Sequence, residues 1–254
     1  MTPDDPPRLH PTVQAYVANR RIAEEYDAYF DGHPLFAYDA RFLAERLAAR
    51  VPGRLLDLGC GTGRHLLPFA RAGWEVTGVD LNPHILREAS KKLADAGVSI
   101  VKTPGGSNTA RLLRADFLAL DDVLAGERFD VVLLMFSTLG LVWPEARRRM
   151  FLAGLRERVS PGGSVFLHVH NARYRLEPDE VETGDRIMKG YRGILDLYLH
   201  SFTRDELLSF FSDCGFRVVE FCPLNARRNG PYTGPDADRE ANGFLAEIAP
   251  SNNH

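Results

Sequence analysis

From residue 54 onward, two patterns of apolar and polar positions alternate along the chain. The first is a short run in which nearly every residue is apolar, such as "FDVVLLMF" at 129–136. Such a run is typical of a strand that is buried on both faces of a sheet. Strands are predicted on this basis at 54–59, 75–80, 111–116, 129–136, 164–170 and 216–221, with a seventh at 243–249.

The second pattern places apolar residues at helical spacing between these strands. The segment 83–97 has Pro83 near its first position and Gly97 just past its end, which are typical helix boundaries. Thr203 and Glu206, three residues apart, form the sequence pattern of a capping box. Further helices are predicted at 64–73, 144–159 and 203–215, and "SPGG" at 160–163 predicts a turn.

Strands that alternate with helices predict the fold class. The expected architecture is α/β, with a doubly wound, mostly parallel seven-stranded sheet and helices on both faces. In such a sheet, ligands bind outside the carboxyl ends of the strands, near the point where the strand order reverses. Residues just after each predicted strand are therefore the candidates for ligand binding.

The segments before residue 54 and after residue 170 depart from this alternation. Residues 1–12 are rich in Pro and Asp and predict a disordered tail. Apolar positions within 13–30 and 38–49 predict two helices, and hence an N-terminal helical cap over 13–50. The remaining residues, 51–249, are assigned to one domain with an inserted segment at 171–202.

The inserted segment is longer than a simple link between a strand and a helix, and loops of this length are often functional lids. Within it, "DRIMKGYRGILDLYL" predicts a β-hairpin that turns at Gly190 or Gly193. Two interpretations remain open. The hairpin either presents Tyr191 and Tyr198 to a ligand or covers a sheet edge.

Composition narrows the class of partner. The 254 residues are 44% hydrophobic, and the formal net charge is −3 with a pI near 6.2. A nucleic-acid binder usually carries a basic excess, so a small-molecule partner is favoured and no nucleic acid is expected. The three cysteines show no metal-ligand spacing, and we expect no metal site. Sparse cysteines and the lack of a signal or membrane-spanning run predict a cytoplasmic protein, either a monomer or a homodimer.

The turn after the first strand carries the clearest chemical signal. In "DLGCGTG", Gly59, Gly61 and Gly63 let the backbone approach a ligand closely. The nicotinamide pattern G-x-G-x-x-G differs in spacing, and the lysine of a phosphate-binding loop is missing. Asp57 beside the turn suits a ligand with an ammonium group, and Asp80 at the end of the second strand can accept two ribose hydroxyls.

These residues resemble a known family. "DLGCGTGRHLLPFARAGWEVTGVDLNPHIL" is similar to the first two motifs of the class I S-adenosylmethionine-dependent methyltransferases. "RADF" at 114–117 and "FDVVLLMFSTLG" at 129–140 resemble the motifs that follow, and the likeness extends over roughly 54–220. The resemblance implies a Rossmann-like methyltransferase domain at 51–249, with S-adenosylmethionine as methyl donor and S-adenosylhomocysteine as product.

The resemblance also implies roles for individual residues. Asp57 would hold the methionine ammonium, Asp80 the ribose hydroxyls, and Asp116 the adenine amino group. The glycines would let the backbone pass the methionine and ribose, and Arg64 would either meet the methionine carboxylate or be solvated. The implied cofactor-binding set is Asp57, Gly59, Cys60, Gly61, Gly63, Asp80, Leu81, Asp116, Phe117 and Phe136, with Phe136 beside the transferred methyl.

No decisive catalytic motif is present. The [DNS]-P-P-[YFW] signature of base N-methylation is replaced by "FSTLGLVWP", which disfavours nucleic acid as acceptor. If a general base is needed, His170 at the end of the fifth strand and Tyr26 in the cap are the candidates. His168 is interpreted mainly as a core histidine with a hydrogen-bond partner, and His200 as a weaker candidate in the insertion.

The predicted function is methyl transfer from S-adenosylmethionine to a nitrogen or oxygen of a small molecule. One alternative is a methyltransferase that acts on a protein or RNA. Another is a non-catalytic S-adenosylmethionine-binding sensor or assembly protein. A nicotinamide oxidoreductase is disfavoured by Asp57 and by the glycine spacing.

Overall fold

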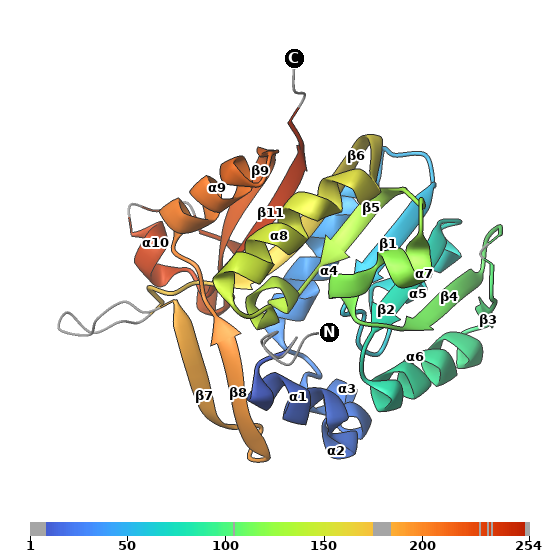
Figure 1. Ribbon diagram of the computed structural model, residues 1–254, viewed down its shortest axis with the longest axis horizontal. Coiled ribbons are helices and arrows are strands. Elements are labelled where there is room, and N and C mark those ends of the chain that lie inside the picture. Colours follow the sequence, from blue (N-terminus) through green and yellow to red (C-terminus); the bar gives the residue numbers. More distant parts are fainter. Residues whose placement is uncertain are drawn as a thin grey trace, which may run out of the picture.

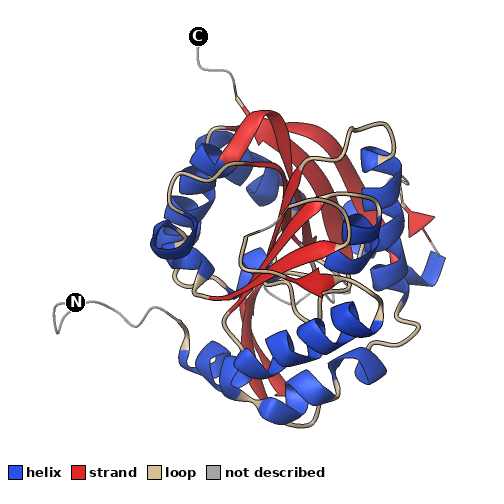
Figure 2. Ribbon diagram, turned by 90° about the vertical axis from the view of Figure 1, so that its right-hand side faces the viewer, coloured by secondary structure: helices blue, strands red, loops and turns tan. Residues whose placement is uncertain are grey.

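The computed structural model describes residues 9–103, 105–174, 184–228, 230–232, 234 and 236–251. A central sheet runs through the molecule with helices on both of its faces (Figures 1 and 2). The sheet order is β10-β9-β11-β6-β5-β1-β2-β4-β3. The strands are β1 Arg54–Leu58, β2 Glu75–Asp80, β3 Ser99–Ile100, β4 Thr109–Arg114, β5 Phe129–Leu134, β6 Val159–His170, β9 Phe216–Asn225, β10 Gly230–Pro231 and β11 Gly243–Pro250.

The pairing confirms a doubly wound, mostly parallel sheet. β1 pairs in parallel with β2 and β5, while β11 runs antiparallel between β6 and β9. All seven predicted strands are present. The two-residue strands β3 and β10 extend the sheet edges beyond the seven expected, because they are too short to produce a hydrophobic period.

The predicted turn at 160–163 is wrong. These residues belong to β6, whose pairing with β5 shifts register between Phe129 and Val131. Gly162, with a φ of +78°, supplies the left-handed conformation inside this irregular start of the strand. A Pro-Gly-Gly sequence therefore marks a bulged strand entry here.

The helices cover both faces of the sheet. The single helix expected over 13–30 is divided, because Asn19 is extended and its side chain accepts a hydrogen bond from the backbone N–H of Ile22 at 3.0 Å. The helix α1 begins at Pro11, inside the predicted tail, and residues 1–8 of that tail lie outside the described residues. The helices are α1 Pro11–Ala18, α2 Arg20–Glu24, α3 Tyr26–Tyr29, α4 Pro34–Leu47, α5 Leu66–Arg71, α6 Pro83–Asp95, α7 Asp121–Leu124, α8 Glu145–Leu155, α9 Arg204–Asp213 and α10 Ala237–Glu240.

The predicted hairpin is confirmed. Strands β7 (Asp185–Tyr191) and β8 (Leu195–His200) pair antiparallel, and Gly190 and Gly193 flank the turn with positive φ. The hairpin lies beside α1 at one end of the sheet (Figure 1), where Val13 packs with Leu197 and Tyr198 in a small apolar cluster. The N-terminal cap and the insertion therefore support each other. Residues 175–183 of the insertion lie outside the described residues.

The core and the strand order together position the candidate site. Two large apolar clusters fill the two faces of the sheet. β1 has β2 on one side and β5 on the other, so the strand order reverses at β1. The carboxyl ends of these three strands meet the cap at this switch point, where a ligand site is expected. Among the described residues, no helix is long and apolar enough to cross a membrane.

Candidate active site

A cavity opens at the carboxyl ends of β1, β2 and β5. It contains about 1030 Å³ of empty space, counting its open mouth. Two residues of the expected set, Gly63 and His170, are not part of its lining. Ten expected residues do line it: Tyr26, Asp57, Gly59, Cys60, Gly61, Asp80, Leu81, Asp116, Phe117 and Phe136.

The glycine turn is fastened to the end of β2. The backbone N–H of Gly59 donates to the carbonyl of Val79 at 2.8 Å, and the N–H of Gly61 donates to Asp80 Oδ2 at 3.0 Å. A Cβ on Gly61 would have its nearest neighbour at 3.9 Å, so this glycine leaves open space on the cavity side. Gly63 instead turns toward α6, where a Cβ would lie 3.5 Å from Ala89.

Asp57 has an unpaired carboxylate oxygen at the end of β1. The residue is 1% exposed, and no hydrogen-bond partner is found for its Oδ2 among the described residues. His65 Nδ1 lies 3.9 Å away, but burial lowers the pKa of His65 to about 3, so the imidazole is neutral. Burial also raises the pKa of Asp57 to about 7. A buried carboxylate in this state is completed by a cationic ligand.

Asp80 is the last residue of β2, and Asp116 lies two residues beyond the end of the neighbouring strand β4. Asp80 Oδ1 accepts from the N–H of Asn82 at 2.9 Å, and Oδ2 accepts from the glycine turn. Burial raises the pKa of Asp80, while these N–H groups counteract the shift. Each oxygen keeps a second acceptor position for ligand hydroxyls. Asp116 Oδ1 accepts from the N–H of Leu118 at 2.9 Å, which fixes its orientation at the cavity wall.

Arg64 lies in the cavity wall and is partly buried. Its side chain is 21% exposed, stacks over the Phe36 ring at 3.3 Å, and pairs through Nη2 with Asp39 at 3.2 Å. Asp39 Oδ1 accepts from His168 Nδ1 at 2.7 Å, which places His168 in the core with a partner. Burial raises the pKa of Asp39, but His168 and Arg64 outweigh it and the pKa lies below its usual value. Arg64 Nη1 has no partner among the described residues and could bind a ligand carboxylate.

The turn after β5 carries backbone strain. Phe136 and Ser137 have φ values of +50° and +67°, a conformation that costs non-glycine residues energy and often marks a functional site. The turn holds the Phe136 ring edge-to-face with Phe36, with centroids 4.4 Å apart, at the cavity wall. Nothing in the local sequence predicts this conformation, because neither position is glycine.

The two candidate bases differ in position. His170, expected to face the cleft, lies outside the cavity lining, with its ring 5.9 Å from that of Phe136 and Nδ1 hydrogen-bonded to the Ser137 hydroxyl. Burial lowers the pKa of His170 to about 4. Tyr26 does line the cavity, and burial raises its pKa to about 12, so its hydroxyl stays protonated at neutral pH. A role as base stays a prediction for both residues.

Sequence reasoning missed one wall of the cavity. It is formed by α1, by Leu9 two residues before α1, and by the 3₁₀ turn after β5. The apolar positions Val13, Tyr16 and Val17 did predict a helix, but their spacing does not indicate that they face the cavity, and Leu9 lies in the predicted tail. The residues of this wall, called the α1 wall below, are Leu9, Val13, Tyr16, Val17, Leu141 and Val142.

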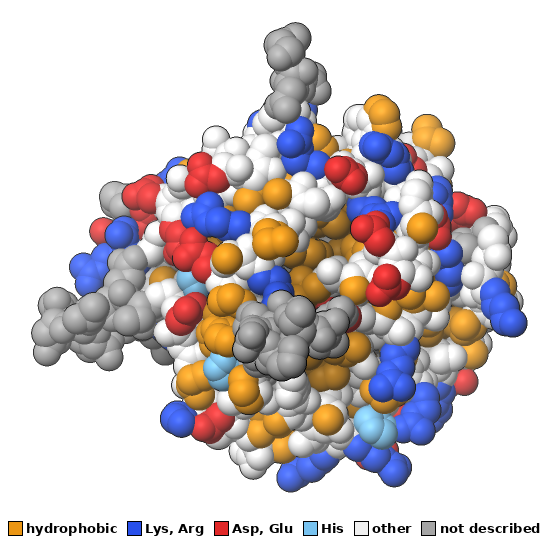
Figure 3. All heavy atoms as spheres, in the orientation of Figure 1, with side chains coloured by type: hydrophobic (Ala, Val, Ile, Leu, Met, Phe, Trp, Pro, Cys, Tyr) orange, Lys and Arg blue, Asp and Glu red, His pale blue; other side chains and the backbone are white. Residues whose placement is uncertain are grey.

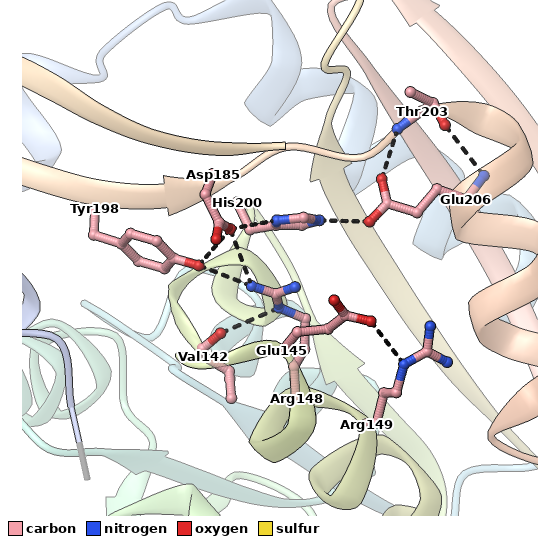
Figure 4. A network of polar contacts seen from close by, with 9 residues as sticks. All are labelled: Val142, Glu145, Arg148, Arg149, Asp185, Tyr198, His200, Thr203 and Glu206. Carbon is pink, nitrogen blue, oxygen red and sulfur yellow. Dashed lines mark hydrogen bonds and ion pairs between the residues drawn. The ribbon is translucent and has the colours of Figure 1, made fainter. Parts of the chain in front are cut away.

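A polar network centred on a buried arginine contacts the α1 wall at Val142 (Figure 4). Arg148 of α8, 1% exposed, donates to the Val142 carbonyl at 3.1 Å and to the Tyr198 hydroxyl at 2.9 Å. The Tyr198 hydroxyl donates to Asp185 Oδ1 at 2.7 Å. His200 Nδ1 and Nε2 contact Asp185 and Glu206, each at 2.7 Å, so both its ring nitrogens are occupied by structural partners. The network joins the hairpin to α8 and α9.

Comparison with known proteins identifies the family. A family model described as "Methyltransferase domain" matches residues 55–163. A ubiquinone biosynthesis O-methyltransferase of Cereibacter sphaeroides is 37% identical over 203 residues, which cover 78% of this chain and 74% of that protein. A dTDP-3-amino-3,4,6-trideoxy-alpha-D-glucopyranose N,N-dimethyltransferase of Streptomyces venezuelae is 30% identical over 146 residues. That match covers 56% of this chain and only 54% of the relative.

Solved structures agree on the fold. The CcbJ methyltransferase from Streptomyces caelestis superimposes with a TM-score of 0.66 at 24% identity, covering 91% of this chain and 96% of that one. The glycopeptide N-methyltransferase MtfA, solved in complex with S-adenosyl-L-methionine, gives a TM-score of 0.55 at 24% identity over 83% of this chain and 92% of that one. Together with the glycine turn and the acids at the ends of β1 and β2, these matches show that the chain belongs to the class I S-adenosylmethionine-dependent methyltransferases.

Proposed function

We propose that this protein transfers a methyl group from S-adenosylmethionine to a nitrogen or oxygen atom of a small molecule. The observation that carries the proposal is Asp57, whose buried and unpaired carboxylate oxygen suits a cationic partner. The methionine ammonium supplies that charge. The names of the relatives, an N,N-dimethyltransferase and an O-methyltransferase, support both acceptor atoms.

The residues present fit the cofactor along its length. Asp57 would hold the ammonium, Arg64 Nη1 the carboxylate, and Asp80 the ribose hydroxyls. Asp116 would accept from the adenine amino group, between Leu81 and Phe117. The ammonium and the carboxylate of the methionine part would therefore each bind an atom that has no hydrogen-bond partner within the described part of the protein, Asp57 Oδ2 and Arg64 Nη1 respectively.

When bound, the cofactor supplies a methyl group already activated on a sulfonium. The chain then has to bind, orient and exclude water, since alignment supplies much of the rate of such a displacement. The strained turn at Phe136 and the adjoining Thr138 would form the wall beside the methyl group. The Tyr26 hydroxyl, which stays protonated, would donate a hydrogen bond within the cavity.

A small acceptor is proposed because residues of the N-terminal cap line the site, and the hairpin packs on α1 from behind. On the face seen in Figure 3, basic and acidic side chains are interspersed, which is not the basic surface of a nucleic-acid binder. The three free thiols of Cys60, Cys214 and Cys222 agree with the proposed cytoplasmic location. We propose no nucleic-acid or membrane partner, and either a monomer or a homodimer.

The test combines binding with turnover. Calorimetric titration should show binding of S-adenosylhomocysteine and none of NADH, and labelled S-adenosylmethionine should transfer its methyl group to a small-molecule fraction. Tight NADH binding without S-adenosylhomocysteine binding would overturn the proposal. Transfer only to protein or RNA would replace the acceptor class, and cofactor binding without any transfer would favour a sensor.

A further inference from the structure

The cofactor contacts proposed above leave one part of the cavity unassigned. Its boundary is the α1 wall, together with Tyr26. We infer that the acceptor is an uncharged amine on an apolar body, bound against the α1 wall. This inference rests on the proposed function and names the substrate class of the same site.

The α1 wall is built as a fixed surface. Val13 and its neighbours pack onto the hairpin in one apolar cluster, and the N–H of Tyr198 donates to the Thr12 hydroxyl at 2.8 Å. Arg148 holds the Val142 carbonyl from the other side. An apolar surface that is held in place from behind favours a ligand with an apolar body, because burying that body removes its surface from water.

The charges on the cavity lining disfavour an anionic acceptor. The acidic side chains that line the cavity are Asp57, Asp80 and Asp116, all at the cofactor end. Among the described lining residues, Arg64 is the only Lys or Arg, and it is committed to Asp39 and to the proposed carboxylate. A phosphate or carboxylate placed against the α1 wall would lose its hydration and would meet no Lys or Arg among the described residues that line this part of the cavity, which is costly.

The wall also discriminates between an amine and a phenol. A phenol must lose its proton to become a good nucleophile, and the described residues of the α1 wall, with Tyr26, include no carboxylate or imidazole that could accept it. The two polar side chains here, Tyr16 and Tyr26, are themselves phenols, and burial raises the pKa of both. A neutral amine already carries the electron pair that attacks the methyl group, so it needs no such base.

The proposed methyl transfer to nitrogen needs no general base. The nitrogen electron pair forms the new N–CH₃ bond as the S–CH₃ bond breaks, and the electron pair of the broken bond passes to sulfur. The methylated nitrogen is then an ammonium, which releases its proton to water at the cavity mouth. No oxidant or reductant is needed.

Three probes with the same aromatic ring test the acceptor class. Phenethylamine is an apolar amine, 4-ethylphenol is an apolar phenol, and phenylalanine adds a carboxylate to the amine. We expect phenethylamine to have the highest kcat/KM, by at least about tenfold, with the product methylated at nitrogen. Faster methylation of 4-ethylphenol or phenylalanine, or methylation of none of the three, would overturn this inference.

Titration of the same protein preparation with S-adenosylhomocysteine distinguishes a wrong acceptor class from a wrong proposed function. If the cofactor product binds while the probes behave differently from expectation, only the acceptor class is wrong. If the cofactor product does not bind, the proposed function itself is wrong.

A matched pair of variants tests the location. Val17→Glu places a charge in the α1 wall and should lower kcat/KM for phenethylamine by at least about tenfold, with S-adenosylhomocysteine affinity retained as evidence of folding. Val51→Glu makes the same substitution at a residue that is 87% exposed and outside the cavity, and should leave activity unchanged. Equal activity of the two variants would overturn the assignment of the acceptor to the α1 wall.

Discussion

Replacing Asp57 by Asn should weaken cofactor binding and stabilise the empty protein. The substitution keeps the shape of the side chain and removes its charge. In the empty protein, burial raises the pKa of Asp57 from 3.8 to about 7, so the charged form is disfavoured by about 4 kcal/mol at most. The ligand ammonium should recover part of this energy, and we expect Asp57→Asn to weaken S-adenosylhomocysteine binding at pH 8 by about 1.5–3 kcal/mol.

The same group predicts how binding depends on pH. A cation binds the ionised carboxylate, so a proton must leave Asp57 whenever binding occurs below about pH 7. Affinity should then fall by about 1.4 kcal/mol for each pH unit below that point, and stay constant above it. Calorimetric titrations from pH 5 to pH 9 measure this slope. Asp57→Asn should abolish it.

Asp57→Asn should have the opposite effect on the stability of the empty protein from its effect on ligand affinity. The folded-state pKa of Asp57 is raised above its unfolded value, so its contribution to stability is present at low pH and is lost as pH rises toward about 7. Without ligand at pH 8, the Asn variant should therefore unfold at a higher urea concentration than the wild type. A wild-type affinity that is flat between pH 5 and pH 8, or an Asn variant that is less stable, would refute the reasoning.

Three further predictions concern the turn, the ribose contact and the network. Asp80→Ala should weaken S-adenosylhomocysteine binding by about 1.5–3 kcal/mol in calorimetry; unchanged affinity in the folded variant would exclude its role. Gly59→Ala would put a Cβ 2.8 Å from a threonine hydroxyl and should lower the unfolding free energy more than Gly126→Ala, which has a similar φ of +71° but no neighbour within 4 Å. Equal losses would show that backbone strain alone matters. Arg148→Met leaves the buried Val142 carbonyl without its side-chain donor and should lower the unfolding free energy by about 1–3 kcal/mol in urea denaturation, whereas Arg149→Met removes exposed ion pairs worth at most about 1 kcal/mol. Similar costs for the two arginines would contradict the structural role of the network.

The long-range polar contacts of the site lay beyond sequence reasoning. Asp39 pairs with His168 across 129 positions and with Arg64 across 25. An acid within a helix of the cap carries no periodic signal that distinguishes it from a solvated acid. Its importance follows from where α4 packs on the sheet, and packing depends on many contacts at once.

Packing between distant segments also determines the α1 wall and the position of His170. The end of β6 could be predicted, and with it the approximate location of His170. Whether its imidazole reaches the cavity depends on the strained turn that places Phe136 at the cavity wall. That turn is stabilised by aromatic contacts from the cap, so local preference at two non-glycine residues could not reveal it.

The sequence by itself determined the alternation of strands and helices, the glycine turn, and the acids at or just beyond the ends of β1, β2 and β4. These features are local: hydrophobic period sets each element, and parallel strands bring their carboxyl ends to one edge of the sheet. Only the tertiary structure decided that an oxygen of Asp57 has no partner, that His170 lies outside the cavity lining, and that the α1 wall is left for the acceptor. Those outcomes depend on burial and on contacts between residues far apart in the chain, which no local pattern encodes.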